Sequence, residues 1–296
     1  MKIFVTGASG FIGFPVVSDL IQAGHQVAAL ARSEESARKI LSLDPKIDIV
    51  RGNLEDLDTL SKAAANSDGV IHLGFIHEFD RYDECCEIDR IANLAMLKAI
   101  EGTNKPFIYA NGTFMLPDGK ISDEEQRRDP SVHNLRGETE EIVLAHKDKG
   151  VRAMVIRLAA TVHGKGEQAF IPILIEIAKS RKVSGYIGTG QNVWPAVHRL
   201  DAARLFNLAL IRGSAGSVYH GVAEQGVKIR DIAQAIGASL NLPVVPIDPE
   251  EASTHFGSLA AFLVRDTPLS SEKTRAQLGW EPRELNLLDD MRLNYF

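Results

Sequence analysis

Apolar and polar positions follow two alternating patterns along the first half of the chain. Short apolar runs alternate with longer segments in which apolar residues recur at helical spacing. The apolar runs are Lys2–Val5, Gln26–Ala31, Ile47–Val50, Gly69–Leu73, Pro106–Ala110 and Val151–Leu158, and the helical segments are Phe14–Ala23, Ser33–Leu43, Leu57–Ala64, Asp83–Ile100 and Gly137–Lys147. Strands that alternate with helices of this length indicate βαβ units and a parallel sheet buried on both faces. The pattern therefore predicts a doubly wound α/β domain.

The alternation becomes less regular after Gly164. The pattern predicts helices at Phe170–Ser180, Asp201–Ile211 and Ile229–Leu240, strands at Val193–Leu200 and Ser217–Gly221, and Gly-rich and Pro-rich connections at Ser184–Gly190 and Pro243–Pro249. We predict that residues 1–163 form the sheet domain, with residues 191–221 returning to it. Residues 164–296 then mainly form a smaller, substrate-binding lobe at the carboxyl ends of the strands, where open α/β folds bind ligands.

Composition narrows the class of protein. The 296 residues are 45% hydrophobic and 24% charged, which is typical of a soluble globular protein. A net charge of -6 provides no basic field for nucleic acid, and no apolar stretch approaches the roughly 20 residues that span a bilayer. The adjacent Cys85 and Cys86 fit neither a disulfide framework nor zinc spacing, and the first strand leaves no room for a presequence. We expect a cytoplasmic protein without a metal, nucleic-acid or membrane partner.

A glycine-rich turn directly follows the first predicted strand. Residues 6–13 read TGASGFIG and lead into the first predicted helix. In such a turn one glycine allows the tight bend, a second lets a pyrophosphate approach the backbone, and a third lets helix and strand pack closely. The placement inside a βαβ unit predicts a dinucleotide-binding loop. Its members are Gly7, Ser9, Gly10, Phe11, Ile12 and Gly13.

The end of the second predicted strand bears on the choice of dinucleotide. An acidic residue at this position would bind the ribose 2′-hydroxyl of NAD, whereas an arginine suits the 2′-phosphate of NADP. Arg32 and Ser33 stand here, and Ser33 is also a typical N-cap for the next helix. The nearby Glu34 and Glu35 would repel a phosphate if they lay close to it. We predict that NADP(H) is preferred and that NAD(H) is possible.

Several further motifs occur in the order found in one known family. They are the glycine turn, Gly52-Asn53-Leu54, His72-Leu73-Gly74, Arg157-Leu158, Val162-His163-Gly164, Val197-His198-Arg199-Leu200-Asp201 and Leu278-Gly279-Trp280-Glu281-Pro282. Over nearly its whole length the chain resembles the extended short-chain dehydrogenases/reductases, a group that includes the NAD-dependent epimerases and dehydratases. The resemblance implies a Rossmann-type fold and a homodimer paired through the helices at Asp83–Ile100 and Gly137–Lys147. It also implies cofactor contacts at Asn53, Leu54, Leu73, Gly74, Phe75, Asn111 and Leu158.

The catalytic pair of that family is missing. Its reductases carry Tyr-x-x-x-Lys, in which the lysine lowers the tyrosine pKa so that the phenol can exchange a proton with the substrate. None of the five tyrosines here has a lysine four residues later. The resemblance aligns the tyrosine with His133 and the lysine with Gly137, beside Arg136, and the family's helix asparagine with Asp89. The chain therefore resembles an atypical member.

Three interpretations of the altered centre remain open. In the first, Thr113 hydrogen-bonds a substrate carbonyl while His133 or His163 supplies the proton, as an imidazole can do at neutral pH. In the second, the proton comes from water held by Thr113 and Asn111. In the third, no reaction occurs, and the nucleotide only controls a partner.

The candidate substrate-binding residues lie in loops that the resemblance places around the cleft. They are His77, Phe79, Met115, Trp194 and His198. We predict an NADP(H)-dependent oxidoreductase that reduces a small aldehyde or ketone with a non-standard proton donor. The alternatives are an inactive NADP(H)-binding sensor or scaffold and, ranked below it, a sugar-nucleotide epimerase or dehydratase.

Overall fold

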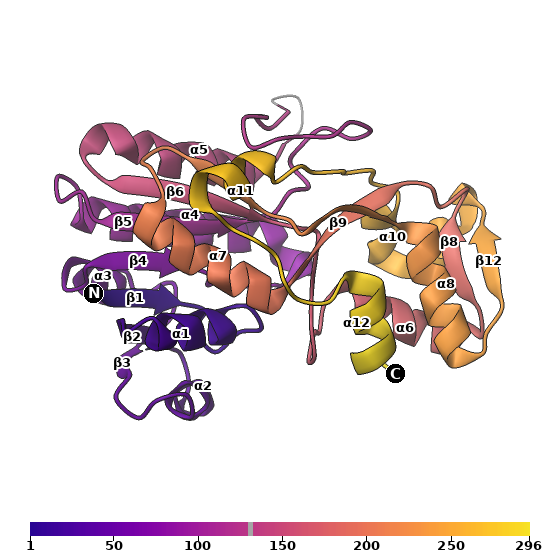
Figure 1. Ribbon diagram of the computed structural model, residues 1–296, viewed down its shortest axis with the longest axis horizontal. Helices are drawn as coiled ribbons and strands as arrows, with labels where there is room; N and C mark the ends of the chain where they lie inside the picture. Colours follow the sequence, from indigo (N-terminus) through magenta and orange to yellow (C-terminus); the bar gives the residue numbers. More distant parts are fainter. Residues whose placement is uncertain (130–132) are drawn as a thin grey trace.

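Seven parallel strands form the central sheet of the protein (Figure 1). The computed structural model describes residues 1–129 and 133–296, apart from the side chain of Phe79. The strands are β1 (Lys2–Thr6), β2 (Gln26–Ala31), β3 (Asp48–Arg51), β4 (Gly69–His72), β5 (Pro106–Asn111), β6 (Arg152–Leu158) and β10 (Val218–Gly221). Their order across the sheet is β10-β6-β5-β4-β1-β2-β3. The order reverses between β1 and β4, and such a reversal is where doubly wound sheets bind ligands.

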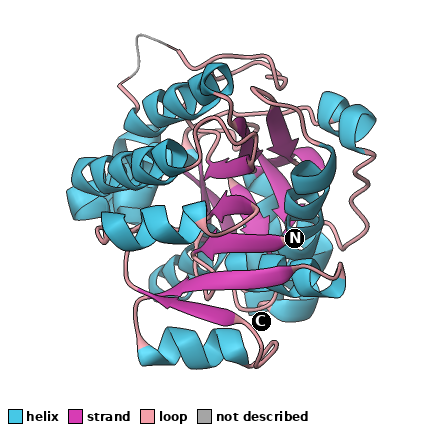
Figure 2. Cartoon of the chain, turned by 90° about the vertical axis from the view of Figure 1, so that its left-hand side faces the viewer, coloured by secondary structure: helices cyan, strands magenta, loops and turns pink. Residues whose placement is uncertain are grey.

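Helices cover both faces of this sheet (Figure 2). One face packs against α1 (Gly13–Gln22), α2 (Glu34–Leu41) and α7 (Arg199–Arg212), and the other against α3 (Leu57–Ala65), α4 (Tyr82–Ala99) and α5 (Leu135–Ala145). Short 3-10 turns, η1 (Phe79–Arg81) and η2 (His146–Lys149), flank α4 and α5. Because both faces are covered, the strands are almost continuously apolar. The predicted Rossmann-type α/β fold is confirmed.

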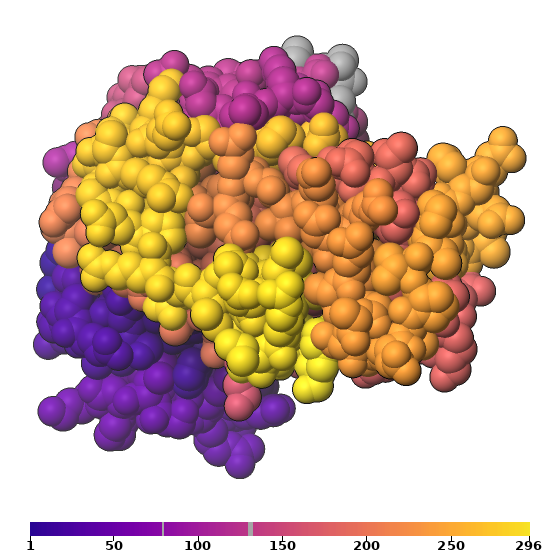
Figure 3. All heavy atoms as spheres, turned by 45° about the vertical axis from the view of Figure 1, so that its right-hand side comes forward, coloured from indigo at the N-terminus to yellow at the C-terminus, as the bar shows by residue number. Residues whose placement is uncertain are grey.

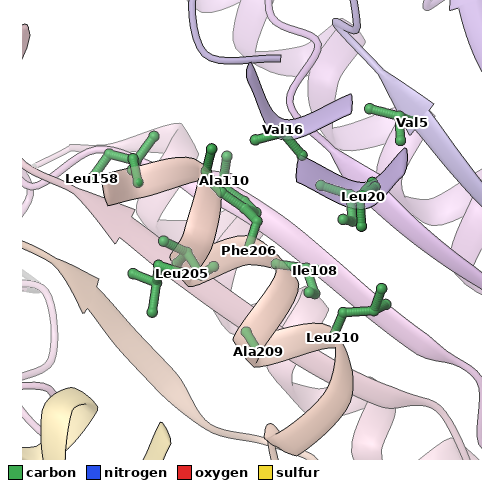
Figure 4. Packing of buried hydrophobic residues seen from close by; sticks show 14 of the residues in the cluster. Val5, Val16, Leu20, Ile108, Ala110, Leu158, Leu205, Phe206, Ala209 and Leu210 are labelled. Carbon is green, nitrogen blue, oxygen red and sulfur yellow. The ribbon is translucent and has the colours of Figure 1, made fainter. Parts of the chain in front are cut away.

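The core on one face joins residues that are distant in sequence (Figure 4). Leu205, Phe206, Ala209 and Leu210 of α7 recur at helical spacing and lie fully buried. They pack with residues of α1, β5 and β6, namely Val16, Leu20, Ile108, Ala110 and Leu158. Burial of a large aliphatic side chain contributes about 1.5–3 kcal/mol. Helix α7 therefore attaches the later part of the chain firmly to the sheet.

The C-terminal lobe contains two small sheets and several helices (Figure 1). Its elements, with the junction strand β7, are β7 (Thr161–His163), α6 (Phe170–Arg181), β8 (Ser184–Ile187), β9 (Val193–His198), β11 (Glu224–Lys228), α8 (Ile229–Leu240), β12 (Val244–Ile247), η3 (Pro249–Glu251), α9 (Ala252–Phe256), η4 (Gly257–Leu259) and α10 (Ala260–Leu263). β11, β9 and β7 form one sheet, and β12 pairs with β8 in parallel. The expectation of plain connections at Ser184–Gly190 and Pro243–Pro249 was wrong, because each contains one of these paired strands.

The last segment of the chain crosses from the sheet domain to the lobe (yellow in Figure 3). It contains α11 (Glu272–Leu278) and α12 (Leu287–Asn294). The buried carboxylate of Asp201 accepts hydrogen bonds from the backbone N–H groups of Arg283 and Glu284, at 2.8 and 3.0 Å. The indole of Trp280 donates to the Asp201 carbonyl at 3.0 Å. These bonds fix the segment against the first turn of α7.

Within the described residues, no helix has both the length and the apolar character that crossing a membrane requires.

Candidate active site

The glycine turn after β1 has almost no free space around its backbone. Gly7 has a φ of +67°, and a Cβ built on it would lie 2.8 Å from the backbone of Leu73 and Gly74. A Cβ on Gly13 would lie 2.1 Å from the carbonyl oxygen of Gly7, and one on Gly10 would lie 3.1 Å from the same oxygen. The loop therefore requires glycine for its own shape, most strictly at Gly13.

The turn presents free backbone donors where a pyrophosphate would bind. At the N-terminus of α1 no side chain caps the helix among the described residues, and the first turn carries no acidic residue. By contrast, Ser33 caps α2 by accepting from the Ser36 N–H, and Glu34 and Glu35 occupy its first turn. An uncapped helix N-terminus behind a glycine turn favours an anion. These features fit the pyrophosphate of a dinucleotide.

A cation beside this loop was missed by sequence reasoning. The guanidinium of Arg199, at the start of α7, lies 5.0 Å from the centre of the Phe11 ring. Its Nε is buried and has no hydrogen-bond partner in the described part of the chain. Only the fold reveals this contact, because Arg199 and Phe11 are far apart in sequence. The positive charge stands next to the predicted pyrophosphate site.

The residues predicted for the adenosine side lie at the ends of β2, β3 and β4. Arg32 and Ser33 are exposed there, and Arg51 donates to the Ser33 carbonyl at 3.2 Å. Arg51 also pairs with Glu34, at 2.5 Å. The carboxylate expected to repel a phosphate is thus held by a second arginine, which the sequence analysis did not single out.

The remaining residues predicted for the adenosine side lie together. Gly74 lies against Leu54, whose side-chain carbon is 3.1 Å from a Cβ built on Gly74, and the adjoining Leu73 is half-buried. The side chain of Asn53 accepts from the Glu55 N–H at 2.7 Å and so stabilises its own turn. The backbone at Asn53 and Leu54 is therefore held in one shape.

Five polar side chains form a hydrogen-bonded chain near the carboxyl ends of β1, β4 and β5. Four of them are buried, and Arg136 at the end of the chain is half-buried. The Thr6 hydroxyl accepts from the Gly74 N–H at 3.0 Å and donates to His72 Nδ1 at 2.6 Å. His72 Nε2 in turn donates to Asp89 at 3.0 Å. The Thr6 hydroxyl and the Asp89 carboxylate thus hold the two ring nitrogens of His72.

Arg136 occupies the other end of this chain. The Tyr109 hydroxyl donates to the second Asp89 oxygen at 2.6 Å and accepts from Arg136 Nε at 3.2 Å. Arg136 also donates to the Ala110 carbonyl at 2.6 Å, and its guanidinium lies 4.3 Å from the centre of the Phe75 ring. Burial raises the pKa of Tyr109 well above its usual value, although Arg136 opposes the shift. Tyr109 is therefore a support for Arg136 and a poor proton donor.

His77 lies at the edge of the same cluster. Its ring meets the Phe75 ring edge-on at 5.0 Å between centroids. Partial removal of water from the imidazole, followed by the positive charge of Arg136, lowers the pKa of His77. We therefore expect His77 to be neutral at pH 7, at the outer side of the Arg136 site.

Thr113 and Asn111 differ in how their polar atoms are used. The buried Thr113 hydroxyl has no hydrogen-bond partner among the residues that the structure describes. The Asn111 amide instead donates to Glu140 at 3.0 Å and to the Arg136 carbonyl at 3.2 Å, and its oxygen accepts from the Gly112 N–H. Asn111 thus has structural bonds at both ends of its amide, whereas Thr113 keeps a free hydroxyl.

The other two catalytic candidates differ in exposure. His133 is exposed. His163 is buried in β7 and donates Nδ1–H to Asp290 of α12 at 2.8 Å, while its Nε2 finds no partner within residues 1–129 and 133–296. Burial lowers the pKa of His163 despite Asp290, so its free nitrogen is an acceptor at neutral pH.

The substrate candidates are dispersed over several elements. Met115 is buried and packs beneath α5, and His198 caps α7 through Nδ1 and meets the His163 ring at 5.3 Å. Leu158, which was predicted to contact the cofactor, is buried in the core. Trp194 is fully buried among aromatic rings. The side chain of Phe79 lies outside the described residues. No group of metal-ligating side chains occurs in the part of the chain that is described.

The Rossmann-type sheet, the glycine turn and the uncapped helix behind it define an NAD(P)-binding protein of the extended short-chain dehydrogenase/reductase type. Comparison with known families agrees: the profile of the NAD dependent epimerase/dehydratase family matches residues 3–220. The chain belongs to this family.

Related proteins span the whole chain. An uncharacterized protein of Saccharomyces cerevisiae is 54% identical over 295 residues, which cover 100% of this chain and 99% of the relative. A 4-hydroxy-2-methyl-3-oxo-4-farnesyl-3,4-dihydroquinoline-1-oxide ketoreductase of Stigmatella aurantiaca is 24% identical, over 96% of this chain and 92% of its own. A solved structure of dTDP-glucose 4,6-dehydratase from Streptomyces venezuelae with bound NAD has a TM-score of 0.78 at 19% identity, covering 99% of this chain and 95% of that one. The last similarity shows a shared fold.

Proposed function

We propose that the protein is an NADP(H)-dependent reductase of a small aldehyde or ketone in which Arg136 replaces the family's missing Tyr–Lys pair. The observation that carries the proposal is the hydrogen-bonded chain from Asp89 through Tyr109 to Arg136. It holds a permanently charged guanidinium at the end of the parallel sheet, beside Phe75. The ketoreductase relative supports the reaction class.

The cofactor would be held by groups already described. The glycine turn and the N-terminus of α1 would bind the pyrophosphate, with Arg199 nearby, and Arg32 with Arg51 would bind the 2′-phosphate. When bound, NADPH supplies a hydride to the carbonyl carbon and leaves as NADP⁺.

The protein would then stabilise the negative charge that develops on the carbonyl oxygen and supply a proton to that oxygen. Fixed donors aimed at an oxygen that gains negative charge are among the strongest catalytic devices. Arg136 and the free hydroxyl of Thr113 are the proposed donors. The proton that completes the alcohol would come from His133, from water in the cleft or, at low pH, from His163. Burial lowers the pKa of His163, so this imidazole is neutral at pH 7 and lacks the proton it would have to give.

The test is the oxidation of NADPH by vicinal diketones and aldehydes, with NADH as the cofactor control. Replacing Arg136 by methionine should lower kcat about 100-fold, the loss typical of one oxyanion donor, while the Kd for NADPH rises less than tenfold. As a control, Arg128→Met removes a different cation, which pairs with Glu141 of α5, the helix that carries Arg136. This variant should keep kcat within twofold of the native value.

The outcomes separate the candidate functions. Undiminished turnover in Arg136→Met would exclude the proposed role of the guanidinium. If the native protein binds NADPH but reduces no carbonyl compound, the inactive sensor becomes the better explanation. His133→Gln and His163→Gln should be compared across pH 5–8, because a proton donor must shift the pH dependence of kcat.

A further inference from the structure

Four aromatic rings meet where the sheet domain contacts the lobe. Phe114 lies in the loop after β5, Phe170 begins α6, Trp194 belongs to β9 and Phe262 to α10. We call these four residues the aromatic cluster. The ring centres of Phe170 and Trp194 are 5.1 Å apart, and those of Phe114 and Phe262 are 5.3 Å apart. Trp194 is fully buried, whereas the three phenylalanines are only half-buried.

The aromatic cluster adjoins the proposed catalytic hydroxyl. Phe114 directly follows Thr113, so the cluster begins one residue from the group proposed to hold the carbonyl oxygen. The indole N–H of Trp194 is buried and, like the Thr113 hydroxyl, lacks a hydrogen-bond partner among the described residues. Buried polar groups are almost always paired, so the Thr113 hydroxyl and the Trp194 N–H are the two donors beside this cluster that acceptors on a ligand would satisfy.

The charge around the aromatic cluster is unsuited to a diphosphate. Arg265 lies over the Phe114 ring, 5.7 Å from its centre, but its guanidinium is paired with Asp118 at 2.6 Å and donates to the Leu116 carbonyl at 3.2 Å. Its positive charge is therefore already neutralised by the protein. A sugar nucleotide needs uncommitted donors for its two phosphate groups.

We infer that the substrate carries a flat aromatic or conjugated ring, which binds against the phenylalanines of the aromatic cluster while its carbonyl oxygen faces Thr113. The inference rests on the proposed reductase function and narrows its substrate class. Stacked or edge-on aromatic pairs strengthen binding about two- to tenfold beyond the effect of the area they bury. A carbonyl substrate with such a ring should therefore be preferred several-fold over one without it.

The experiment compares two substrates with the same reacting group. 1-Phenylpropane-1,2-dione and pentane-2,3-dione are both vicinal diketones, and only the first carries a ring. We expect kcat/KM with NADPH to be about tenfold higher for the phenyl compound. Phe262→Leu and Phe170→Leu should each reduce this ratio about five-fold. Phe256→Leu, a change in the core of the same lobe, should leave the ratio unchanged.

A binding measurement makes the result independent of turnover. With NADP⁺ present, calorimetry should show 1-phenylpropane-1,2-diol binding about tenfold more tightly than pentane-2,3-diol, and Phe262→Leu should reduce this difference about five-fold. Equal kcat/KM for the two diketones would overturn the ring inference and leave the reductase function standing. Competitive inhibition by UDP-glucose at micromolar concentration would also overturn it. Preferential diol binding without any reduction would instead contradict only the reductase function.

Discussion

Beneath the carboxyl ends of β4 and β5, buried polar side chains bond to one another, whereas at the junction with the lobe several have no partner among the described residues. The first region includes the chain from Thr6 to Arg136 and the pair of Arg157 and Glu140. The second includes Thr113 and Trp194.

This difference in hydrogen bonding distinguishes side chains that the protein itself holds in place from side chains whose polar atoms are available to a ligand. A fully bonded network holds its members in one geometry and rigidifies the site. An unpaired buried donor costs free energy unless another group satisfies it. The bonded chain thus fixes Arg136, while Thr113 and Trp194 keep the donors that the proposed substrate would satisfy.

The largest expected effect tests whether the sheet domain depends on its internal pairs. Glu140 accepts from the fully buried Arg157, while its neighbour Glu141 forms a surface pair with Arg128. Glu140→Gln leaves the Arg157 charge incompletely paired, so the free energy of unfolding should fall by about 3–5 kcal/mol in urea titrations. Glu141→Gln on the same helix should cost less than about 1 kcal/mol. Equal losses of unfolding free energy in the two variants would show that the buried Arg157–Glu140 pair contributes no more to stability than the surface Arg128–Glu141 pair.

The second prediction concerns the fixed shape of the cofactor loop. Gly13→Ala places a Cβ 2.1 Å from the Gly7 carbonyl oxygen, so the loop must open and the Kd for NADPH should rise more than about 100-fold. Gly10→Ala meets the same oxygen at 3.1 Å and should have a much smaller effect. Fluorescence titration with NADPH measures both constants. If the two variants bound equally, steric contact would not be the reason for glycine at residue 13.

The third prediction concerns how the free energy of unfolding depends on pH through Glu167, which lies at the junction with the lobe. Burial raises the pKa of Glu167 from 4.5 to about 7, and the Tyr295 hydroxyl donates to its carboxylate. Between pH 4.5 and about pH 7, Glu167 is therefore protonated more often in the native state than in the unfolded state. The free energy of unfolding should therefore fall by up to about 3 kcal/mol as pH rises from 4.5 to 7.

Glu167→Gln cannot ionise and should lose this pH dependence. Glu176→Gln, which alters an exposed pair with Lys179, should keep it. Chemical unfolding at pH 5, 6, 7 and 8 measures the slope. A slope that persists in Glu167→Gln would assign the pH dependence to another group.

The smallest effect concerns the exposed surface at Arg32 and Arg51, which we propose binds the 2′-phosphate of NADP(H). Arg32→Ala should raise the Kd for NADPH about tenfold and that for NADH less than twofold, since only NADPH carries the extra charge. Arg51→Ala should have a smaller effect in the same direction. Arg38→Ala removes the same charge from an exposed position on the neighbouring helix α2 and controls for long-range electrostatics. Equal weakening of both cofactors by Arg32→Ala would contradict the preference for NADP(H).

The sequence predicts local patterns better than pairings between distant segments. The strands of the large sheet follow from continuous apolar runs, and the glycine turn identifies the cofactor end without any structure. β8 and β12 are short and Gly- or Pro-containing, and each exists because the other pairs with it from about 60 residues away. Their propensities alone do not reveal such a pairing.

The candidate site shows the same limit. Arg136 stands beside the position expected for the family's lysine, but its neighbours in sequence do not show that Tyr109 and Asp89 hold it. The link between Asp290 and His163 also joins residues 127 positions apart. Single residues of a motif can be recognised in a sequence, whereas their supporting partners come from the tertiary fold.

The return of the C-terminal segment to α7 has a consequence for how the protein is made. During synthesis the sheet strands up to β6 can pair and collapse well before residues 280–290 leave the ribosome. Until then the carboxylate of Asp201 and the imidazole of His163 lack the partners that bury them. The cofactor half is therefore expected to mature first on the ribosome, and the junction with the lobe closes only when this late segment arrives.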